Sequence, residues 1–176
     1  MKKKTALILI ICGIMLLQAA CGGSKDAVSR EEETAGGVVN PMEEVKDIVE
    51  LQDKLSFMML SLPRYYGEKE SKYFIVGKNL AMQQCQVADH QVEIRQQEGS
   101  GDITGIYQMT YTDAVYEDVT YHYGEKDDYF AAWWENGKYA YSVMVTNITE
   151  DEFISEYAEV LVDMSIFNLE YETQTE

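Results

Sequence analysis

The pair Asn136-Gly137 restricts the fold more than any other feature of the chain. It stands between two segments rich in aromatic and β-branched residues, 128–135 and 138–145. Both residues of the pair tolerate a positive φ angle, which a two-residue type I′ turn requires at its two central positions. The sequence therefore predicts an antiparallel hairpin with Asn136-Gly137 at its tip.

Further turn signals divide the chain from Tyr73 onward into short segments of the same kind. Glycines separate them at Gly77, Gly99-Ser100-Gly101 and Gly124. Such spacing is typical of an antiparallel meander. An apolar run at 57–62, stopped by a proline, predicts one more strand. We expect about six strands in all.

Two helices are predicted, one at each end of the folded region. Asn40-Pro41 supplies a helix cap and a first-turn proline, and apolar residues follow at helical spacing. Near the other end, Thr149 and Glu152 fit a capping box, and an apolar stripe runs from Phe153 to Met164. We expect an α+β domain in which a first helix over 41–54 and a C-terminal helix pack on one face of the sheet.

The domain is expected to cover residues 40–168. Residues 21–39 are polar, include the run Glu31-Glu32-Glu33 and show no apolar period, so they are predicted to be a disordered tether. Residues 169–176 are predicted to be a polar tail. The region between is long enough for one modest hydrophobic core.

Residues 1–20 have the order of a signal peptide. Three lysines precede an apolar stretch from Ala6 to Leu17, and small residues precede Cys21. A dozen helical residues at about 1.5 Å each span only about 18 Å, which is too short for a hydrocarbon core of about 30 Å. We therefore expect a segment that is removed on export and not a permanent transmembrane helix.

The segment Leu17-Gln18-Ala19-Ala20-Cys21 resembles the lipobox of bacterial lipoproteins, whose cysteine carries a diacylglycerol and becomes the mature N-terminus. Gln18 departs from the aliphatic residue that is usual there. The alternative is ordinary secretion, but Gln18 also stands where an A-x-A cleavage site has a small residue. We expect Cys21 to carry a lipid that includes palmitate. The chain is then expected to be extracytoplasmic and anchored to the cell membrane.

The charge of the mature chain restricts its partners. Without residues 1–20 the chain has 11 basic and 31 acidic residues, a net charge of −20. Such a charge repels nucleic acid and anionic lipid headgroups. We expect no nucleic-acid partner, and contact with the membrane only through the lipid.

Few side chains could carry chemistry. The chain has two histidines, His90 and His122, and Cys85 is the one cysteine left after Cys12 is removed and Cys21 is lipidated. A dyad of Cys85 and His90 is one alternative, but no hydrolase or nucleotide-binding motif accompanies it. We expect a protein that is not an enzyme and has no catalytic residues.

Metal and cofactor binding have no better support. Neither the histidines nor the single thiol show ligand spacing, and the acidic group Glu125, Asp127 and Asp128 lacks the oxygen pattern of a calcium loop. A solvated turn explains that group, with weak calcium binding as the alternative. We expect no metal and no cofactor.

Aromatic residues are the more informative feature, because the strands expected within 115–145 carry them on both alternating faces. One face must pack on the helices, and the other exposes large rings unless something covers it. One interpretation is a surface that binds an apolar chain, a glycan or a peptide, since tyrosine and tryptophan suit wet interfaces. The other is that loops such as Ile103–Tyr111 cover the second face. The residues assigned to the ligand surface are Tyr121, Trp133, Tyr139 and Tyr141.

From Asn40 to Met164 the chain resembles a family of lipoproteins of Gram-positive bacteria whose shared domain has no assigned function. The resemblance rests on the segments 103–107 and 132–142, and the chain departs from it at Met42 and Cys85. It implies an envelope location, and distantly a sheet like that of lipoprotein carriers and envelope-stress regulators. The leading interpretation is a membrane-tethered binding or sensing domain. Alternatives are a protein-interaction or inhibitory module that meets another envelope protein, and a wall hydrolase, for which no carboxylate pair is visible.

Overall fold

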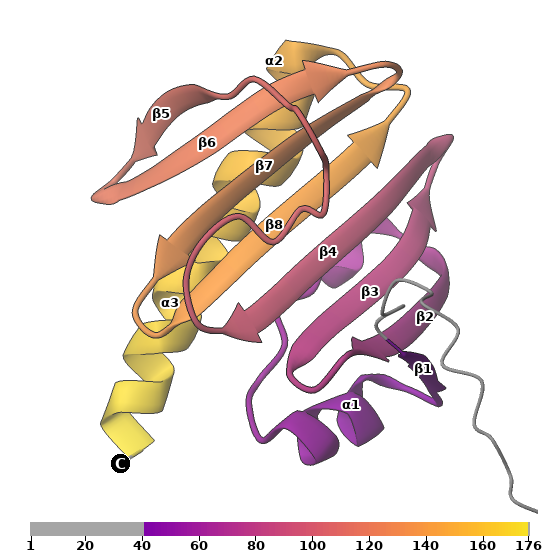
Figure 1. Ribbon diagram of the computed structural model, residues 1–176, viewed down its shortest axis with the longest axis vertical. Coiled ribbons are helices and arrows are strands. Elements are labelled where there is room, and N and C mark those ends of the chain that lie inside the picture. The colour runs from indigo at the N-terminus through magenta and orange to yellow at the C-terminus, as the bar shows by residue number, and fades with distance from the viewer. Residues whose placement is uncertain (1–40, 176) are drawn as a thin grey trace, which may run out of the picture. The chain divides into compact units, whose positions relative to one another are not determined.

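A computed structural model describes residues 41–175, which contain one antiparallel sheet of eight strands in the order β1-β2-β3-β4-β8-β7-β6-β5 (Figure 1). The predicted signal peptide, 1–20, and the predicted tether, 21–39 with Cys21, lie outside the described residues. The sheet consists of two four-stranded meanders joined along β4 and β8. The strands are β1 (Met42–Val45), β2 (Lys69–Val76), β3 (Leu80–Val87), β4 (His90–Glu98), β5 (Thr112–Tyr116), β6 (Val119–Lys126), β7 (Tyr129–Asn136) and β8 (Tyr139–Thr146).

The predicted fold, one meander of about six strands with a helix at each end, is wrong. The single sheet has eight strands, and its two halves meet through β4 and β8, where Ile94 is paired with Val143. Turn signals in the sequence identify strands that are consecutive along the chain. They carry no information on this pairing, which joins residues far apart in the sequence.

The predicted first helix over 41–54 is replaced by two elements. Residues 42–45 form the edge strand β1 against β2, and helix α1 covers only Ile48–Leu55. The carboxylate of Asp47 caps this helix by accepting the N–H of Glu50 at 2.9 Å. Val45 and Leu51 are both buried, so the apolar spacing that suggested one helix belongs to a strand followed by a shorter helix.

The predicted strand at 57–62 is an irregular segment. Its backbone bonds to a buried glutamine of β4 instead of to another strand. The Oε1 atom of Gln96 accepts the N–H of Leu60 at 2.6 Å, and its Nε2 atom donates to the carbonyl of Met58 at 3.2 Å. One side chain thus satisfies two backbone groups of this segment, of which the Leu60 N–H is buried. A 3₁₀ turn, η1 (Arg64–Tyr66), follows.

The C-terminal helix consists of α2 (Glu150–Phe153), the π-helical turn η2 (Ile154–Ala158) and α3 (Glu159–Thr175). The predicted capping box is confirmed, because the Thr149 hydroxyl accepts the N–H of Glu152 and the Glu152 carboxylate accepts the N–H of Thr149. The hydroxyl of Tyr66 donates to the Glu156 carbonyl within the π-helical turn. The helix continues to Thr175, through the segment predicted to be a tail.

The predicted hairpin of β7 and β8 is confirmed, but its turn lies one residue later than expected. Asn136 is the last strand residue and is paired with Tyr139, so Gly137 and Lys138 form the loop. Gly137 has a φ of 61°, and a Cβ atom there would lie 2.6 Å from Leu169 of α3. Both the backbone conformation and the close approach of the helix require glycine at this position.

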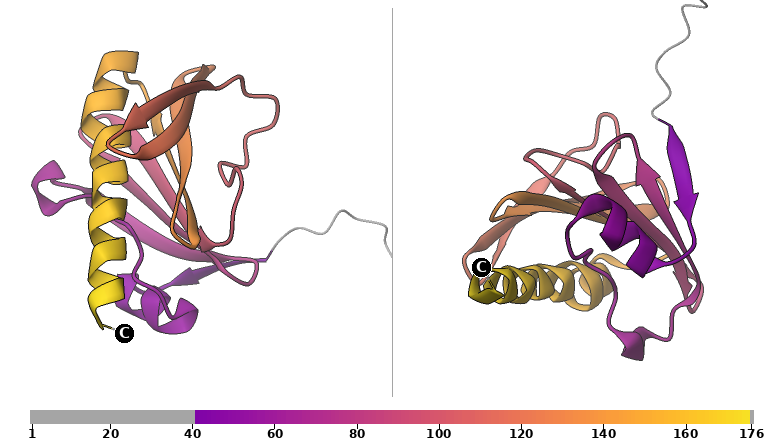
Figure 2. Two further views of the ribbon diagram at one scale, coloured as in Figure 1. Left: turned by 90° about the vertical axis from the view of Figure 1, so that its left-hand side faces the viewer. Right: turned by 90° about the horizontal axis from the view of Figure 1, so that it is seen from below.

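The core lies between the sheet and the helices, which are on the same side of it (Figure 2). We call this the helix side and the opposite surface of the sheet the outer face. On the helix side, Trp134 is fully buried, stacks on Tyr141 with ring centroids 5.4 Å apart, and donates from Nε1 to Ser165 Oγ at 3.1 Å. Tyr121, Phe153 and Tyr157 complete this aromatic part of the core.

Candidate functional site on the outer face

The connection from β4 to β5, residues 99–111, crosses the outer face and is called the strap here (Figure 1). The topology demands this crossing, because β4 lies in the middle of the sheet and β5 at its far edge. The strap therefore covers part of the second sheet face, as one of the two interpretations of the aromatic strands expects. Within the strap, Ile103 and Thr104 are buried.

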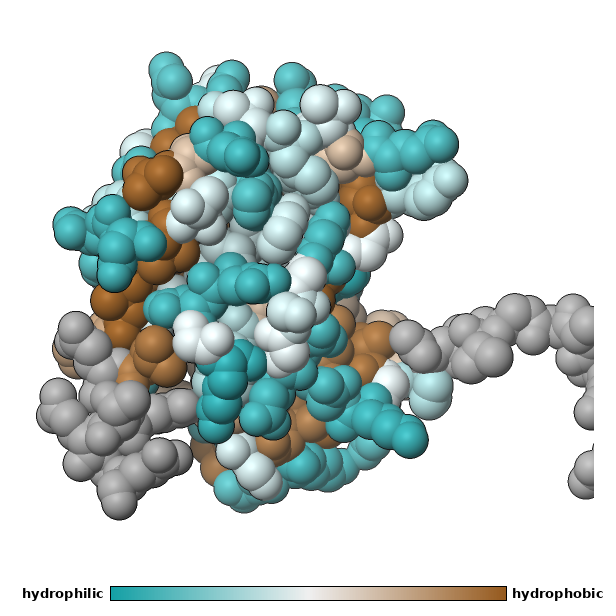
Figure 3. Space-filling view, turned by 60° about the vertical axis from the view of Figure 1, so that its left-hand side comes forward, coloured by the Kyte–Doolittle hydropathy of each residue, from teal (hydrophilic) through white to brown (hydrophobic). Residues whose placement is uncertain are grey.

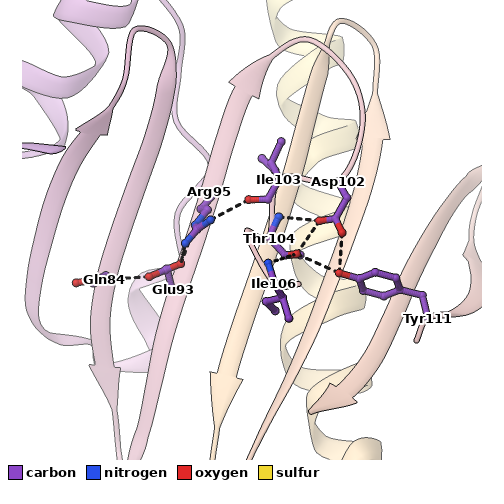
Figure 4. Close-up of polar contacts among 8 residues, drawn as sticks. All are labelled: Gln84, Glu93, Arg95, Asp102, Ile103, Thr104, Ile106 and Tyr111. Carbon is purple, nitrogen blue, oxygen red and sulfur yellow. Dashed lines mark hydrogen bonds and ion pairs between the residues drawn. The ribbon is translucent and has the colours of Figure 1, made fainter. Parts of the chain in front are cut away.

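A single carboxylate organises the strap. Asp102 Oδ1 accepts the backbone N–H of Thr104 at 2.8 Å and its hydroxyl at 2.7 Å, while Oδ2 accepts the Tyr111 hydroxyl at 2.8 Å (Figure 4). Burial is the main reason that the pKa of Tyr111 rises to about 12, so this hydroxyl stays a donor at neutral pH. The two ends of the strap are thus tied together through Asp102.

An arginine on β4 ties the strap to the sheet. Arg95 Nη1 donates to the carbonyl of Ile103 at 3.0 Å, and its Nη2 lies 2.6 Å from Glu93 Oε1 (Figure 4). Glu93 also accepts from Gln84 Nε2 at 2.8 Å. The Glu93 carboxylate therefore holds the guanidinium in the orientation that reaches the strap.

The strap also lies very close to β6. A Cβ atom on Gly124 would be 2.3 Å from the carbonyl oxygen of Thr110, so only glycine allows this approach. At its first end, the N–H of Gly101 donates to Glu135 Oε1 at 2.6 Å. The strap is therefore held at several points along its path across β8, β7 and β6.

A groove of about 380 Å³ opens on the outer face beside the strap. Two rings form its aromatic wall, because His122 of β6 stacks on Trp133 of β7 with centroids 4.1 Å apart and an angle of 25° between planes. Asp113 Oδ1 lies 2.7 Å from His122 Nδ1 and fixes the imidazole. Tyr111 of the strap approaches Trp133 edge-on at 6.3 Å. The groove is lined by Asp118, Val119, Thr120, His122, Trp133, Glu135, Asn136 and Gly137.

The structure does not bring together the four residues assigned to a ligand surface. Trp133 lies on the outer face and is half-buried, whereas Tyr121, Tyr139 and Tyr141 are 2–3% exposed and belong to the core on the helix side. Strand alternation explains the division, since Trp133 is paired with Ser142 and its neighbour Trp134 with Tyr141. Of the four, only Trp133 lines the groove.

Sequence reasoning missed the other groove residues, above all His122, Glu135 and Asn136. One signal could have found the first of them. A hairpin turn at Asp127-Asp128 places His122 directly opposite Trp133, because the register of a hairpin follows from its turn. The carboxylate and amide could not be assigned to a site without knowing where the strap crosses.

The groove is rich in hydrogen-bond acceptors. Asp118 and Glu135 contribute carboxylates and Thr120 a hydroxyl, and no lysine or arginine lines it. Asn136 also borders the groove, but its amide donates to Ser165 Oγ at 3.4 Å on the helix side. The indole N–H of Trp133 is buried and has no hydrogen-bond partner within 41–175. Such a lining disfavours anionic ligands and suits ligands that donate hydrogen bonds.

The alternative of a Cys85–His90 dyad finds no support in this geometry. Burial, together with the nearby Glu68 carboxylate, raises the pKa of Cys85 to about 12, so the thiol is protonated at neutral pH and a weak nucleophile. His90 Nδ1 lies 3.0 Å from the carbonyl oxygen of Thr146. Within residues 41–175 no contact joins the two side chains, and no group of three or more His, Cys, Asp or Glu residues is placed to hold a metal ion.

Comparisons of the chain with protein-family models, with curated proteins and with solved structures find no match in any of the three. The resemblance to lipoproteins of Gram-positive bacteria therefore stays a prediction. Across the described residues, no helix is both long and apolar enough to cross a bilayer.

Proposed function

We propose that this chain is an extracytoplasmic lipoprotein whose folded domain is a binding domain and not an enzyme. Its anchor is a lipid on Cys21, and its ligand site is the groove beside the strap. The observation that carries the proposal is the stacked pair of His122 and Trp133 within a lining of hydrogen-bond acceptors.

The chemistry of the groove favours a glycan as the ligand. Sugar hydroxyls donate to carboxylate and amide oxygens, and the C–H faces of sugar rings pack on aromatic side chains. The carboxylates of Asp118 and Glu135 provide acceptors, and the rings of His122 and Trp133 provide the apolar surface. A neutral glycan also avoids the repulsion that this acidic chain exerts on anions.

The size and polarity of the groove fit this class better than an apolar chain. Its volume of about 380 Å³ lies within the range of about 300–1,000 Å³ that ligand pockets occupy. Val119 is its one aliphatic side chain beyond the rings, so a lipid tail would find little to pack on. Ligand binding here depends on directed hydrogen bonds and on one aromatic surface.

The His122–Asp113 pair supports a positioning role. A carboxylate that fixes an imidazole is also a feature of general bases, which need a proton to abstract within hydrogen-bond reach. Among the described residues, the His122 imidazole forms one hydrogen bond, and its partner is Asp113. We therefore assign the pair to holding the ring against Trp133 and to contacting the ligand.

The two adjacent tryptophans allow a direct test, because Trp133 lines the groove and Trp134 lies in the core on the opposite side. A glycan array of neutral and amino-sugar oligosaccharides first identifies a ligand. Its titration should then change tryptophan fluorescence in the wild type and in Trp134→Phe, but not in Trp133→Phe. Calorimetry should show a smaller heat of ligand binding for Trp133→Phe, and an unchanged heat for Trp134→Phe.

Two outcomes would overturn the ligand assignment. The first is an array on which no neutral or amino-sugar oligosaccharide binds. The second is a ligand whose binding heat survives Trp133→Phe unchanged. Circular dichroism of both variants controls for folding, since Trp134→Phe also removes the bond to Ser165.

The anchor has its own test. Cells that express the full chain and are fed labelled palmitate should incorporate the label into the wild type and into Cys85→Ala, but not into Cys21→Ala. The protein should sediment with membranes in the first two cases and appear in the soluble fraction in the third. Equal labelling of all three would refute lipidation at Cys21.

A further inference from the structure

The charge of the domain is divided unequally between the two halves of the sheet. Residues 41–98, with β1–β4, have seven basic and ten acidic residues, a net charge of −3. Residues 99–175, with the strap, β5–β8 and the C-terminal helix, have two basic and sixteen acidic residues, a net charge of −14. General solubility requires no such division of charge. The concentrated negative charge of the second half would attract a cationic partner.

An open cleft lies within this acidic half, between α3 and the turn that joins β5 to β6. Its volume is about 640 Å³, and its lining combines acidic and apolar side chains. Phe167 of α3 is 69% exposed there, and Ile166 beside it packs partly on the core. Figure 3, which brings this side of the domain forward, shows apolar residues (brown) along one side next to hydrophilic ones (teal). The lining residues are Glu117, Asp118, Asp163, Ile166 and Phe167.

The carboxylates around the cleft act on a neighbouring hydroxyl. The pKa of Tyr116, at the end of β5, is raised first by the charge of Asp163, then by burial and by the charges of Glu117 and Glu159. Tyr121 faces the same helix, and its pKa is raised to about 12 by burial and then by Glu159. The mouth of the cleft thus has a negative potential that comes from two separate elements, the turn and the helix.

We propose that this cleft is the docking site for a segment of another protein in which lysine or arginine residues surround one apolar side chain. The apolar side chain packs on Phe167 and Ile166, and the cations pair with Glu117, Asp118 and Asp163. An exposed aromatic ring with a charged rim is the arrangement of an interface centre, where a desolvated anchor is bordered by polar pairs.

Charge complementarity selects this occupant over the others. A second copy of the chain would bring a like charge, and so would an anionic membrane surface. The tether of the same chain, 21–39, has two basic residues against four acidic ones and therefore cannot supply the cations. A basic segment of a different protein remains, and the proposal does not depend on the glycan site.

The test uses the purified mature chain without lipid and a pool of synthetic peptides. Each peptide is about a dozen residues of lysine, arginine and serine around one leucine, phenylalanine or tryptophan, and its partner has serine in place of that anchor. Dissociation constants are measured by fluorescence anisotropy at about 0.15 M salt, where long-range attraction is screened. Anchored peptides should bind at least about tenfold more tightly than their serine versions.

Two turns of the protein provide a matched control for charge. Glu117-Asp118 and Asp127-Asp128 are both two-residue hairpin turns, and the first residue of each has a positive φ, 53° and 57° respectively. Reversing both charges of either turn to lysine changes the net charge and the backbone strain by the same amount. Glu117→Lys with Asp118→Lys should weaken peptide binding at least about tenfold, and the Asp127→Lys, Asp128→Lys control by less than about threefold.

Phe167→Ser should weaken peptide binding by a similar factor without any change of charge. Equal weakening by the two charge-reversal pairs would reduce the effect to general attraction and overturn the proposal. Peptide binding that survives Phe167→Ser, or a pool in which no anchored peptide binds, would do the same. Because Asp118 borders both sites, Phe167→Ser and Trp133→Phe separate them, and each should leave the other ligand's affinity unchanged.

Discussion

Asp102→Ala is the sharpest test of how the strap is held on the outer face. The carboxylate accepts three hydrogen bonds, from the Thr104 N–H, the Thr104 hydroxyl and the Tyr111 hydroxyl, at 2.7–2.8 Å. The substitution removes all three acceptors at once and leaves the Thr104 N–H, which is buried, without a partner. We expect the strap to be released while the sheet beneath it stays folded.

The expected cost follows from the number and kind of these bonds. A hydrogen bond to a charged group contributes about 1.5–3 kcal/mol, but three that share one carboxylate do not add. The Thr104 hydroxyl also keeps its contact with the Tyr111 hydroxyl at 3.0 Å and so recovers part of the loss. We expect the free energy of unfolding, or of local strap opening, to fall by about 2–4 kcal/mol.

Two measurements separate global from local effects. Urea unfolding reports the global free energy, and chymotrypsin cleavage after Tyr107, which is 79% exposed within the strap, reports local opening. Asp113→Ala is the control, because it makes the same substitution at a carboxylate with one hydrogen bond, to His122. Asp102→Ala should be cut much faster than this control. If the two variants have equal cleavage rates and unfolding energies within about 0.5 kcal/mol, the account of the strap is refuted.

Gln96→Leu should lower the free energy of unfolding by about 1–3 kcal/mol in urea titration, because the buried Leu60 N–H and the part-buried Met58 carbonyl lose their partner. Gln97→Leu on the outer face should cost less than about 1 kcal/mol. Gly124→Ala should cost about 1–3 kcal/mol in the same assay, since the strap must move away from the new Cβ atom. Burial raises the pKa of Tyr111, Tyr121 and Tyr157 to about 12. The folded state then holds these protons more tightly than the unfolded chain, so the stability that the three hydroxyls contribute is complete below about pH 10 and is lost as the pH rises toward about 12. Urea titrations between about pH 10 and about pH 12 should show this fall, and constant stability over that range would contradict it.

Local features of the fold could be predicted from the sequence because nearby residues determine them. The capping box needs only Thr149 and Glu152, which lie three positions apart. The β7–β8 hairpin needs two strand-forming segments and a glycine, although Leu169 of the distant helix also fixes where the turn lies. The capping box and the hairpin turn are thus both determined mainly by residues close together in the sequence.

The remaining elements depend on partners that are remote in sequence. Residues 42–45 have an apolar pattern that fits a helix, but the backbone of β2 pairs with them and makes them a strand. The run at 57–62 has the composition of a strand, yet Gln96 takes its backbone bonds in place of a neighbouring strand. In both cases tertiary hydrogen bonding overrides a local preference that was read correctly.

The same reasoning explains why the candidate site was recovered only in part. The aromatic residues of β6, β7 and β8 predict one surface of four residues, but alternation puts Trp133 on one side of the sheet and Tyr121, Tyr139 and Tyr141 on the other. The deciding fact is which side the C-terminal helix occupies, and no local signal contains it. Once the helix covers the tyrosines, Trp133 must be covered by something else or remain accessible.

The strap provides that cover only in part, and its route explains where the groove lies. The strap connects β4 to β5 at the far edge of the sheet, so it crosses β8, β7 and β6. It is held there by contacts at Arg95, Asp102 and Gly124. Tyr111 reaches Trp133 edge-on, while His122 stacks on the ring of Trp133 and both line open space. A topology that needs a crossing connection thus covers part of the outer face, over β8, β7 and β6, and leaves one aromatic pair beside it. The edge of the strap is therefore where an aromatic surface on the outer face can still bind a ligand.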